Sequence, residues 1–215
     1  MSNKNQSLLK EIKKSGILRL ILNEPKNKNA LSKKMISKLK EAISFASSDD
    51  LVKVIIIAAN GNVYSAGHDL KEITEARFHK DDGNSYFRDL FNSCSDLMKL
   101  IVESPKPIIA EVNGVATAAG CQLVASCDLA ISSDDSRFAT PGVNIGLFCS
   151  TPMVALSRSI SKKDAMKMLL TGDMITANEA KSISLINDHV PEEELTESVM
   201  QLAQKIAQKS SMTLK

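Results

Sequence analysis

Residues 108–122 have the sequence IIAEVNGVATAAGCQ, in which a short apolar run is followed by a turn rich in small residues. Ile108–Val112 predicts a buried strand, and Asn113-Gly114 predicts the turn that ends it. The alanine-rich segment after this turn predicts a helix. A helix that starts at Ala118 or Ala119 directs its unpaired backbone N–H groups, and the positive end of its dipole, away from the strand.

A second stretch follows the same plan. Val52–Ala59 is a β-branched run that predicts a buried strand, and Tyr64–Lys71 (YSAGHDLK) follows it. Small side chains in both turns allow another atom to approach the backbone closely. Two N–H donors that converge on one point stabilise an oxyanion. The alternative is that these small residues only permit tight packing of helix against strand.

The rest of the chain alternates between strand and helix patterns. Strands are predicted over 16–22, 128–132 and 137–140, and helices after Ser32, over 84–103, from Thr151, after the pairs Ser161/Asp164 and Thr176/Glu179, and over 192–209. This alternation predicts an α/β protein with largely parallel strands.

Composition excludes several classes of protein. The longest apolar run, Val54–Ala59, is too short to cross a bilayer, so no membrane span is expected. Residues 1–14 lack a signal-peptide core. The four cysteines have no metal-ligand spacing and only three histidines are present, which argues against a metal site. Free thiols in a cytoplasmic protein are the expectation.

Charge is concentrated at the start of the chain. Residues 1–40 contain eleven Lys/Arg and two acidic residues. Such a segment suits phosphate groups, although a solvated lysine face on a helix is the simpler interpretation. The segment has no aromatic residue to stack on bases, so nucleic acid is not an expected partner. Dinucleotide-binding, phosphate-loop and nucleophile-elbow motifs do not occur.

Several short segments resemble, in order, the crotonase (enoyl-CoA hydratase/isomerase) family. They include residues 22–25, 29–31, 65–70, 105–110, 112–116, 120–123, 127–128, 138–141 and 170–172. The resemblance implies a crotonase (ClpP-like) spiral of ββα units with a helical C-terminal part, an acyl-CoA thioester ligand, and a homotrimer or dimer of trimers. It places a core over residues 1–190 and the start of an apparently incomplete C-terminal helical region over 191–215.

The same resemblance assigns roles to residues. It places the two oxyanion donors at the backbone N–H groups of His68 and Ala119, and CoA phosphate contacts at Lys28 and Lys71. Further CoA or substrate contacts fall on Ala30, Ala66, Asp69, Leu70, Ala118 and Pro141. No cofactor is implied beyond the CoA moiety of the substrate. For the two lysines, ordinary surface exposure remains the alternative.

The sequence departs from the family pattern at the two acid/base positions. Hydratases of this family use two glutamates, and the corresponding residues here are Gln122 and Gly142. Glutamine does not exchange a proton near neutral pH, and glycine has no side chain. Efficient hydration is therefore not expected, whereas decarboxylation, thioester hydrolysis or isomerisation remain open. A non-catalytic acyl-CoA-binding protein, or a hydratase as the family name suggests, are the alternatives.

Residues 138–152 resemble most the enoyl-CoA hydratase domain-containing protein 3 subgroup, and the His68 position resembles the methylmalonyl-CoA decarboxylase branch. The His68 ring is expected to pack or to face solvent. Cys149 is interpreted as a buried structural thiol, because no histidine lies nearby in the sequence. Glu111 is interpreted as a surface or intersubunit group.

Overall fold

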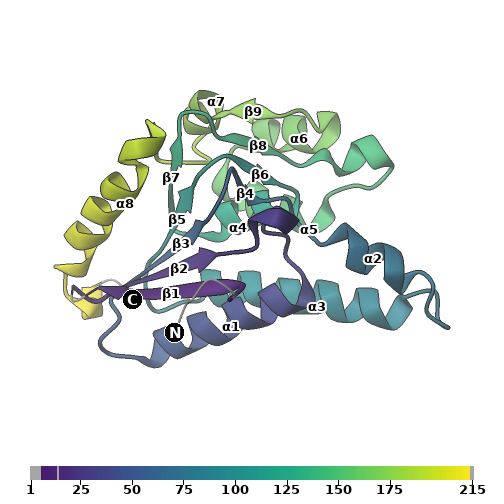
Figure 1. Cartoon of the computed structure of the whole chain (residues 1–215). Coiled ribbons are helices and arrows are strands. Elements are labelled where there is room, and N and C mark those ends of the chain that lie inside the picture. Colours follow the sequence, from purple (N-terminus) through teal and green to yellow (C-terminus); the bar gives the residue numbers. More distant parts are fainter. Residues whose placement is uncertain (1–5, 14, 214–215) are drawn as a thin grey trace.

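The larger of two sheets forms the centre of the molecule. The computed structural model describes residues 6–13 and 15–213. This sheet has the order β1-β2-β3-β5-β7-β10 (Figure 1). Its strands are β1 (Leu8–Lys13), β2 (Ile17–Leu22), β3 (Val54–Ala59), β5 (Ile108–Val112), β7 (Leu129–Ser133) and β10 (Asp188–Val190). Only β1 and β2 pair antiparallel in this sheet, among the described residues, so the predicted parallel arrangement is confirmed.

A smaller sheet lies beside the first. It has the order β4-β6-β8-β9, with β4 (Val63–Ser65), β6 (Val115–Thr117), β8 (Arg137–Ala139) and β9 (Ile175–Thr176). A strand of the larger sheet is followed three times by a short strand of the smaller one, as in β3-β4, β5-β6 and β7-β8. Each pair leads into a helical segment, which gives the repeated ββα unit of the expected spiral.

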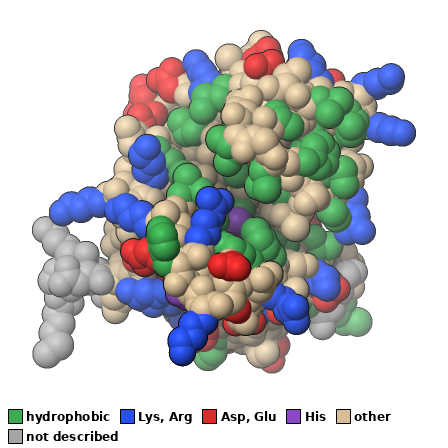
Figure 2. Space-filling view, turned by 90° about the vertical axis from the view of Figure 1, so that its right-hand side faces the viewer, with side chains coloured by type: hydrophobic (Ala, Val, Ile, Leu, Met, Phe, Trp, Pro, Cys, Tyr) green, Lys and Arg blue, Asp and Glu red, His purple; other side chains and the backbone are tan. Residues whose placement is uncertain are grey.

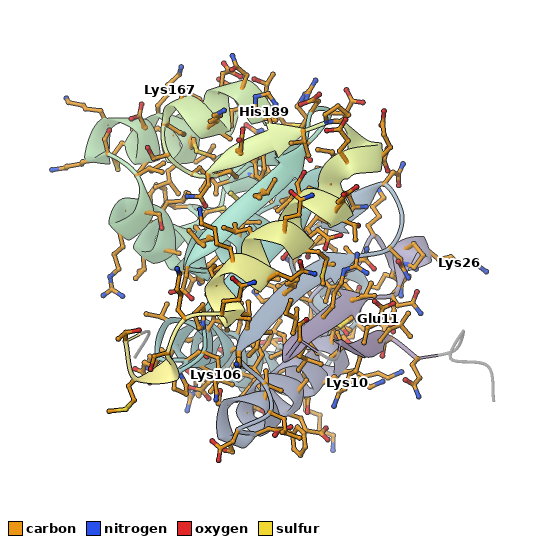
Figure 3. All side chains as sticks on the ribbon, turned by 90° about the vertical axis from the view of Figure 1, so that its left-hand side faces the viewer. Lys10, Glu11, Lys26, Lys106, Lys167 and His189 are labelled. Carbon is orange, nitrogen blue, oxygen red and sulfur yellow. The ribbon has the colours of Figure 1, made fainter. Side chains whose placement is uncertain are left out.

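Helices cover both faces of the larger sheet. They are α1 (Lys33–Ser48), α2 (Leu70–Ala76), α3 (Asn84–Val102), α4 (Ala119–Ser126), α5 (Ser150–Ser159), α6 (Lys162–Thr171), α7 (Ala177–Ser182) and α8 (Glu192–Ala207), with short 3-10 turns η2 (Pro25–Asn27), η3 (Pro141–Ile145) and η4 (Ser211–Thr213). α1 and α3 lie together on one side of the sheet (Figure 1), and α8 crosses the other side (Figure 3).

Strand β3 shows why the sheet is buried on both faces. Ile55 and Ile57 belong to the core under α1 and α3, whereas Val54 and Ile56 belong to the core under α8. Successive side chains of a strand point to opposite faces, so a continuous apolar run can fill both cores. α8 follows Pro191 directly. Whether a separate helical region starts at residue 191 stays a prediction.

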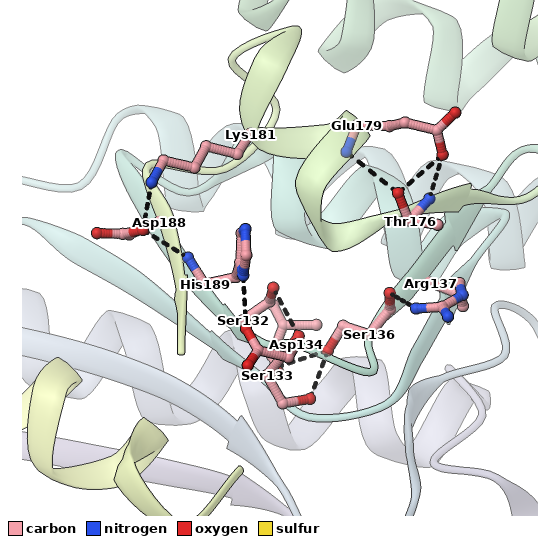
Figure 4. Close-up of polar contacts among 11 residues, drawn as sticks. Ser132, Ser133, Asp134, Ser136, Arg137, Thr176, Glu179, Lys181, Asp188 and His189 are labelled. Carbon is pink, nitrogen blue, oxygen red and sulfur yellow. Dashed lines mark hydrogen bonds and ion pairs between the residues drawn. The ribbon is translucent and has the colours of Figure 1, made fainter. Parts of the chain in front are cut away.

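The helix starts confirm most of the capping pattern in the sequence. Ser32 Oγ accepts a hydrogen bond from Met35 N at 3.1 Å. Thr176 N donates to Glu179 Oε2 at 2.7 Å, and Glu179 N donates to Thr176 Oγ1 at 3.2 Å, which completes one capping box (Figure 4). At Ser161 the capping box is incomplete. Asp164 N donates to Ser161 Oγ, but the Asp164 carboxylate accepts a hydrogen bond from the Ser161 hydroxyl and not from the Ser161 backbone N–H.

Some elements were not predicted. β4, β6, β9 and β10 have two or three residues each, too few to show a period of two. β1 was missed because its sequence, LLKEIK, is half polar. α2 begins directly after Asp69, whose Oδ1 caps the helix by accepting a hydrogen bond from Lys71 N at 2.9 Å.

The interpretation of Glu111 as a surface group was wrong. Glu111 is 4% exposed and faces α8 from strand β5. Its carboxylate receives hydrogen bonds from Arg19 Nε at 2.9 Å and Nη2 at 2.5 Å, and from Thr196 Oγ1 at 2.7 Å. Burial acts to lower the pKa of Arg19, but its bonds and charge contact with Glu111 outweigh this and raise it. The pair ties β2, β5 and α8 together.

Candidate active site

Two turns that are far apart in the sequence touch in the structure. One covers residues 65–69 after β4, and the other covers residues 117–120 at the start of α4. A Cβ atom added at Gly67 would lie 3.1 Å from Ala119 N, and one added at Gly120 would lie 2.2 Å from Ser65 O. Gly120 has no room for a side chain, and Gly67, whose φ of 89° also favours glycine, has little, so the two glycines let the two backbones meet.

The residue before α4 has an unusual backbone conformation. Ala118 has φ 51° and ψ −120°, a region that normally favours glycine. Its N–H donates to Ala139 O at 2.9 Å, and its carbonyl accepts from Gln122 N at 3.0 Å, so it is held from both sides. The backbone N–H groups of Ala119 and His68 donate no hydrogen bond to any acceptor in residues 6–13 and 15–213. Both donors therefore remain available to a ligand.

The loop after β2 is fixed beside the first turn. Asn29 is fully buried, and its side-chain amide donates to the carbonyls of Asn60 at 2.9 Å and Val63 at 2.7 Å. Lys28 O accepts a hydrogen bond from Ala66 N at 3.1 Å. These hydrogen bonds hold the loop in one position, because any conformation that left the buried Asn29 amide without partners would cost free energy. The basic loop is therefore held against the His68 turn.

A cavity of about 330 Å³ lies between the loop and the turn. It is lined by Lys26, Asn27, Lys28, Ala30, Ala66, His68, Asp69, Leu70 and Lys71. Figure 2 shows this side of the molecule, with hydrophobic side chains around a central hollow and basic side chains beside it. The cavity brings together His68 and six of the eight residues predicted to contact CoA or substrate.

The His68 ring is fixed by its neighbours. Its Nδ1 lies 3.4 Å from Leu31 O, and the ring packs edge to face on Phe91 with centroids 5.4 Å apart. Nε2 is buried and has no partner among the described residues. Burial lowers the pKa of His68, although the Leu31 carbonyl and Glu72 act to raise it. The ring is therefore neutral at neutral pH, with Nδ1 as its donor and Nε2 as an unused acceptor.

Replacing His68 by glutamine is expected to weaken the dependence of stability on pH. Since folding lowers the pKa of His68, the unfolded chain binds a proton more readily than the folded one. The stabilisation is full above the usual value of about 6.5 and is lost as the pH falls below it. Melting temperatures between about pH 5 and 7.5 would show a smaller decrease for the variant. His79→Gln, at an exposed position, is the control; equal slopes for all three proteins would contradict this assignment.

Gln122 lies beside a second cavity of about 410 Å³, between α3, α4 and α5. Its Oε1 is buried without a partner, as are His68 Nε2 and Thr140 Oγ1. In residues 6–13 and 15–213, these three are all the buried side-chain nitrogen and oxygen atoms that lack a hydrogen-bond partner. Thr140 precedes Pro141 and Gly142, so all three atoms belong to segments that the sequence singled out. Unsatisfied buried groups are rare and concentrate at functional sites.

Gly142, where the resemblance placed the second hydratase glutamate, has no room for a side chain. A Cβ atom at Gly142 would lie 2.3 Å from Leu147 O and 2.7 Å from Cys149 Sγ. Burial raises the pKa of the Cys149 thiol, while a bond from the Gly142 N–H acts to lower it. Burial also raises the pKa of Cys121 to about 12. The four cysteines are unpaired. Both thiols are therefore protonated at neutral pH, which argues against Cys149 as a nucleophile.

Some residues at the site were not predicted from the sequence. Lys26 and Asn27 line the cavity beside His68, and only the charge excess of residues 1–40 pointed to them. Thr140 has no local signal, because its hydroxyl is unpaired only in the folded arrangement. Ala118 contacts the Gly67 position, whereas Pro141 begins η3 and lines neither cavity.

The described residues contain neither a metal-binding cluster nor a membrane-spanning helix. No group of three or more His, Cys, Asp or Glu side chains in residues 6–13 and 15–213 is arranged to hold a metal ion. Within the same ranges no helix is both long and apolar enough to span a membrane.

Comparisons with known proteins match the chain over nearly its whole length. The model of the family described as enoyl-CoA hydratase/isomerase matches residues 12–215. The mitochondrial enoyl-CoA hydratase domain-containing protein 3 of Xenopus laevis is 54% identical over 91% of this chain and 65% of its own length. The human protein of that name is 52% identical over 89% and 62%. The crystal structure of human enoyl-CoA hydratase domain-containing protein 3 has a TM-score of 0.90 and 46% identity, covering 97% of this chain and 80% of that one.

These relatives correct one expectation. Both curated relatives are named mitochondrial, which contradicts the expected cytoplasmic location. Unpaired thiols report the redox state of a compartment and not its identity, so the cysteines did not justify that choice. The chain spans slightly less than two thirds of the length of these two relatives.

Proposed function

Because the chain belongs to the enoyl-CoA hydratase/isomerase family, we propose that it binds an acyl-CoA thioester and polarises the thioester carbonyl. The backbone N–H groups of His68 and Ala119 are the donors. The observation that carries this proposal is the contact between the two turns. A Cβ atom added at Gly67 would lie only 3.1 Å from Ala119 N. Donors fixed in advance, in a site shielded from water, stabilise the charge that develops on the carbonyl oxygen.

The cavity beside His68 is the proposed CoA site. Lys26, Lys28 and Lys71 lie around it, with Asp69 as the acidic residue in its lining. Three ammonium groups provide a field that favours phosphate groups. The pairing of Lys28 O with Ala66 N places this basic loop directly beside the His68 donor. A ligand with both phosphates and a thioester can therefore engage both features at once.

The reaction we favour needs no pair of carboxylates. Gln122 cannot act as a proton donor near neutral pH, and the Cβ direction of Gly142 is blocked by Leu147 O. Each lost acid/base group costs roughly 10²- to 10⁴-fold in rate. Decarboxylation, thioester hydrolysis or isomerisation rely more on a stabilised enolate or oxyanion than on two glutamates. The site therefore favours one of these reactions over efficient hydration.

A non-catalytic acyl-CoA-binding protein is the second candidate function. It is favoured by the same observation, since neither Gln122 nor Gly142 supplies acid/base chemistry. The two N–H donors without an acceptor argue against it, because a site that only binds the ligand does not need to polarise the thioester carbonyl. A mitochondrial location is part of the proposal, carried over from the names of the relatives. Assembly as a homotrimer or dimer of trimers, and a role in fatty acid metabolism, remain predictions.

The test is a thermal shift series with acetyl-, butyryl-, malonyl- and crotonyl-CoA, followed by product detection. A ligand that binds the folded state alone raises the melting temperature, and the shift grows with the logarithm of the ligand concentration above Kd. We expect stabilisation by acyl-CoA, and turnover of a malonyl or simple acyl thioester without efficient hydration of crotonyl-CoA. Binding without any product would support the second candidate. Hydration at usual enzyme rates would contradict both, and the absence of any stabilisation would remove the acyl-CoA site itself.

A further inference from the structure

The cavity beside Gln122 lies about one helical turn from Ala119, the proposed donor to the thioester. Gln122 follows Ala119 by three residues on α4, so the two lie on the same side of the helix about 4.5 Å apart along its axis. Ser126 lies a further turn along and lines the same cavity. A carbonyl held at the Ala119 N–H would therefore direct its acyl group past Gln122 into this space.

The Gln122 side chain is unpaired in a buried position. The residue is 4% exposed, and its carboxamide makes no hydrogen bond within the described part of the chain. Its Oε1 is shielded, whereas Nε2 is not among the shielded atoms. A half-turn of the terminal amide exchanges the two ends, so an N–H donor can face the cavity in either case. An unpaired buried amide gains most from a ligand that accepts a hydrogen bond.

The charges around this cavity favour an anion. Lys99 and Arg158 line it from α3 and α5, and neither takes part in an ion pair between described residues. Glu103 is the acidic residue of the lining, which leaves an excess of one positive charge. A glutamate at position 122 would repel a carboxylate, whereas the glutamine amide attracts it.

We propose that this cavity selects acyl groups with a second carboxylate, so that the preferred ligands are CoA thioesters of dicarboxylic acids. In this arrangement Gln122 donates a hydrogen bond to the carboxylate or to a neighbouring acceptor, and Lys99 and Arg158 supply the attractive field. The inference rests on the proposed function, because it assumes that the thioester lies at His68 and Ala119. It adds the chemical class of the acyl group.

The test compares matched thioesters by isothermal titration calorimetry. Succinyl-CoA differs from butyryl-CoA, and adipyl-CoA from hexanoyl-CoA, by a carboxylate in place of a methyl group. We expect at least one dicarboxylic member to bind about tenfold tighter than its neutral partner, which is the usual effect of one hydrogen bond to a charged group. The pair that shows the larger preference reports how far into the cavity the carboxylate lies.

Three variants separate this inference from the proposed function. Gln122→Glu and Arg158→Gln should each reduce the ratio of dicarboxylic to neutral affinity by severalfold to about tenfold, whatever either change does to the affinity for butyryl-CoA itself. Lys163→Gln, at an exposed position outside the cavity lining, should change neither value. Equal or tighter binding of the neutral members by the unmodified protein overturns the inference alone. Failure of every thioester to bind overturns the proposed function instead.

Discussion

Replacing Gly120 by alanine is expected to weaken acyl-CoA binding by roughly tenfold to 100-fold, the effect of losing two hydrogen bonds to the thioester carbonyl. The added methyl group would lie 2.2 Å from Ser65 O and 2.8 Å from Ser65 Cβ. Ser65 is fully buried, so the turn that carries His68 must move away from α4. The proposed donors, the N–H groups of His68 and Ala119, would then no longer be positioned for one thioester oxygen. Alanine improves helix propensity by about 1 kcal/mol, but overpacking typically costs 1–3 kcal/mol and should exceed this gain.

The matched control is Gly146→Ala. It adds the same methyl group where nothing lies within 4 Å, although its φ of 74° makes alanine strained there. We expect a small loss of stability from that strain and no comparable loss of affinity. Circular dichroism would confirm that both variants fold, and calorimetry with butyryl-CoA would measure binding. Unchanged affinity in folded Gly120→Ala would show that the contact between the turns does not position the ligand.

Replacing Glu111 by alanine is expected to lower the free energy of unfolding by about 1–3 kcal/mol, because the partly buried Arg19 guanidinium loses its two short hydrogen bonds and keeps only the 3.5 Å contact with Glu11 Oε2. Thr196 loses its hydrogen bond to the same carboxylate, so α8 loses one of its attachments to β5. Urea denaturation followed by circular dichroism measures the change. A decrease of this size is a large fraction of the total stability of a single domain.

Two further variants identify the cause of that loss. The double variant Arg19→Met with Glu111→Leu removes both charges and should recover much of the stability, since an apolar pair can replace a buried ion pair. Asp188→Ala removes the exposed pair between Lys181 and Asp188 and should have little effect. If the double variant is no more stable than Glu111→Ala, the loss comes from packing and not from an unpaired charge.

Local patterns in the sequence were sufficient for much of the fold. Val54–Ala59 and Ile108–Val112 formed the strands that their apolar runs predicted, and Ser32 and Thr176 capped the helices that their positions predicted. Such signals depend on neighbours within a few residues, so they survive without knowledge of the fold. Both turns of the candidate site were predicted in the same way, together with the order of segments that identified the family.

The tertiary structure alone decided how these parts meet. The approach of Gly120 to Ser65, the burial of Glu111 against Arg19 and the closure of Leu147 over Gly142 join residues whose proximity no local period encodes. Each depends on the packing of whole elements, which sets distances to a fraction of an ångström and decides which polar atoms find partners. The sequence by itself thus predicted the α/β spiral and two turns of small residues. Only the packed structure showed that the two turns touch and that Gln122 faces an open cavity with its amide unpaired.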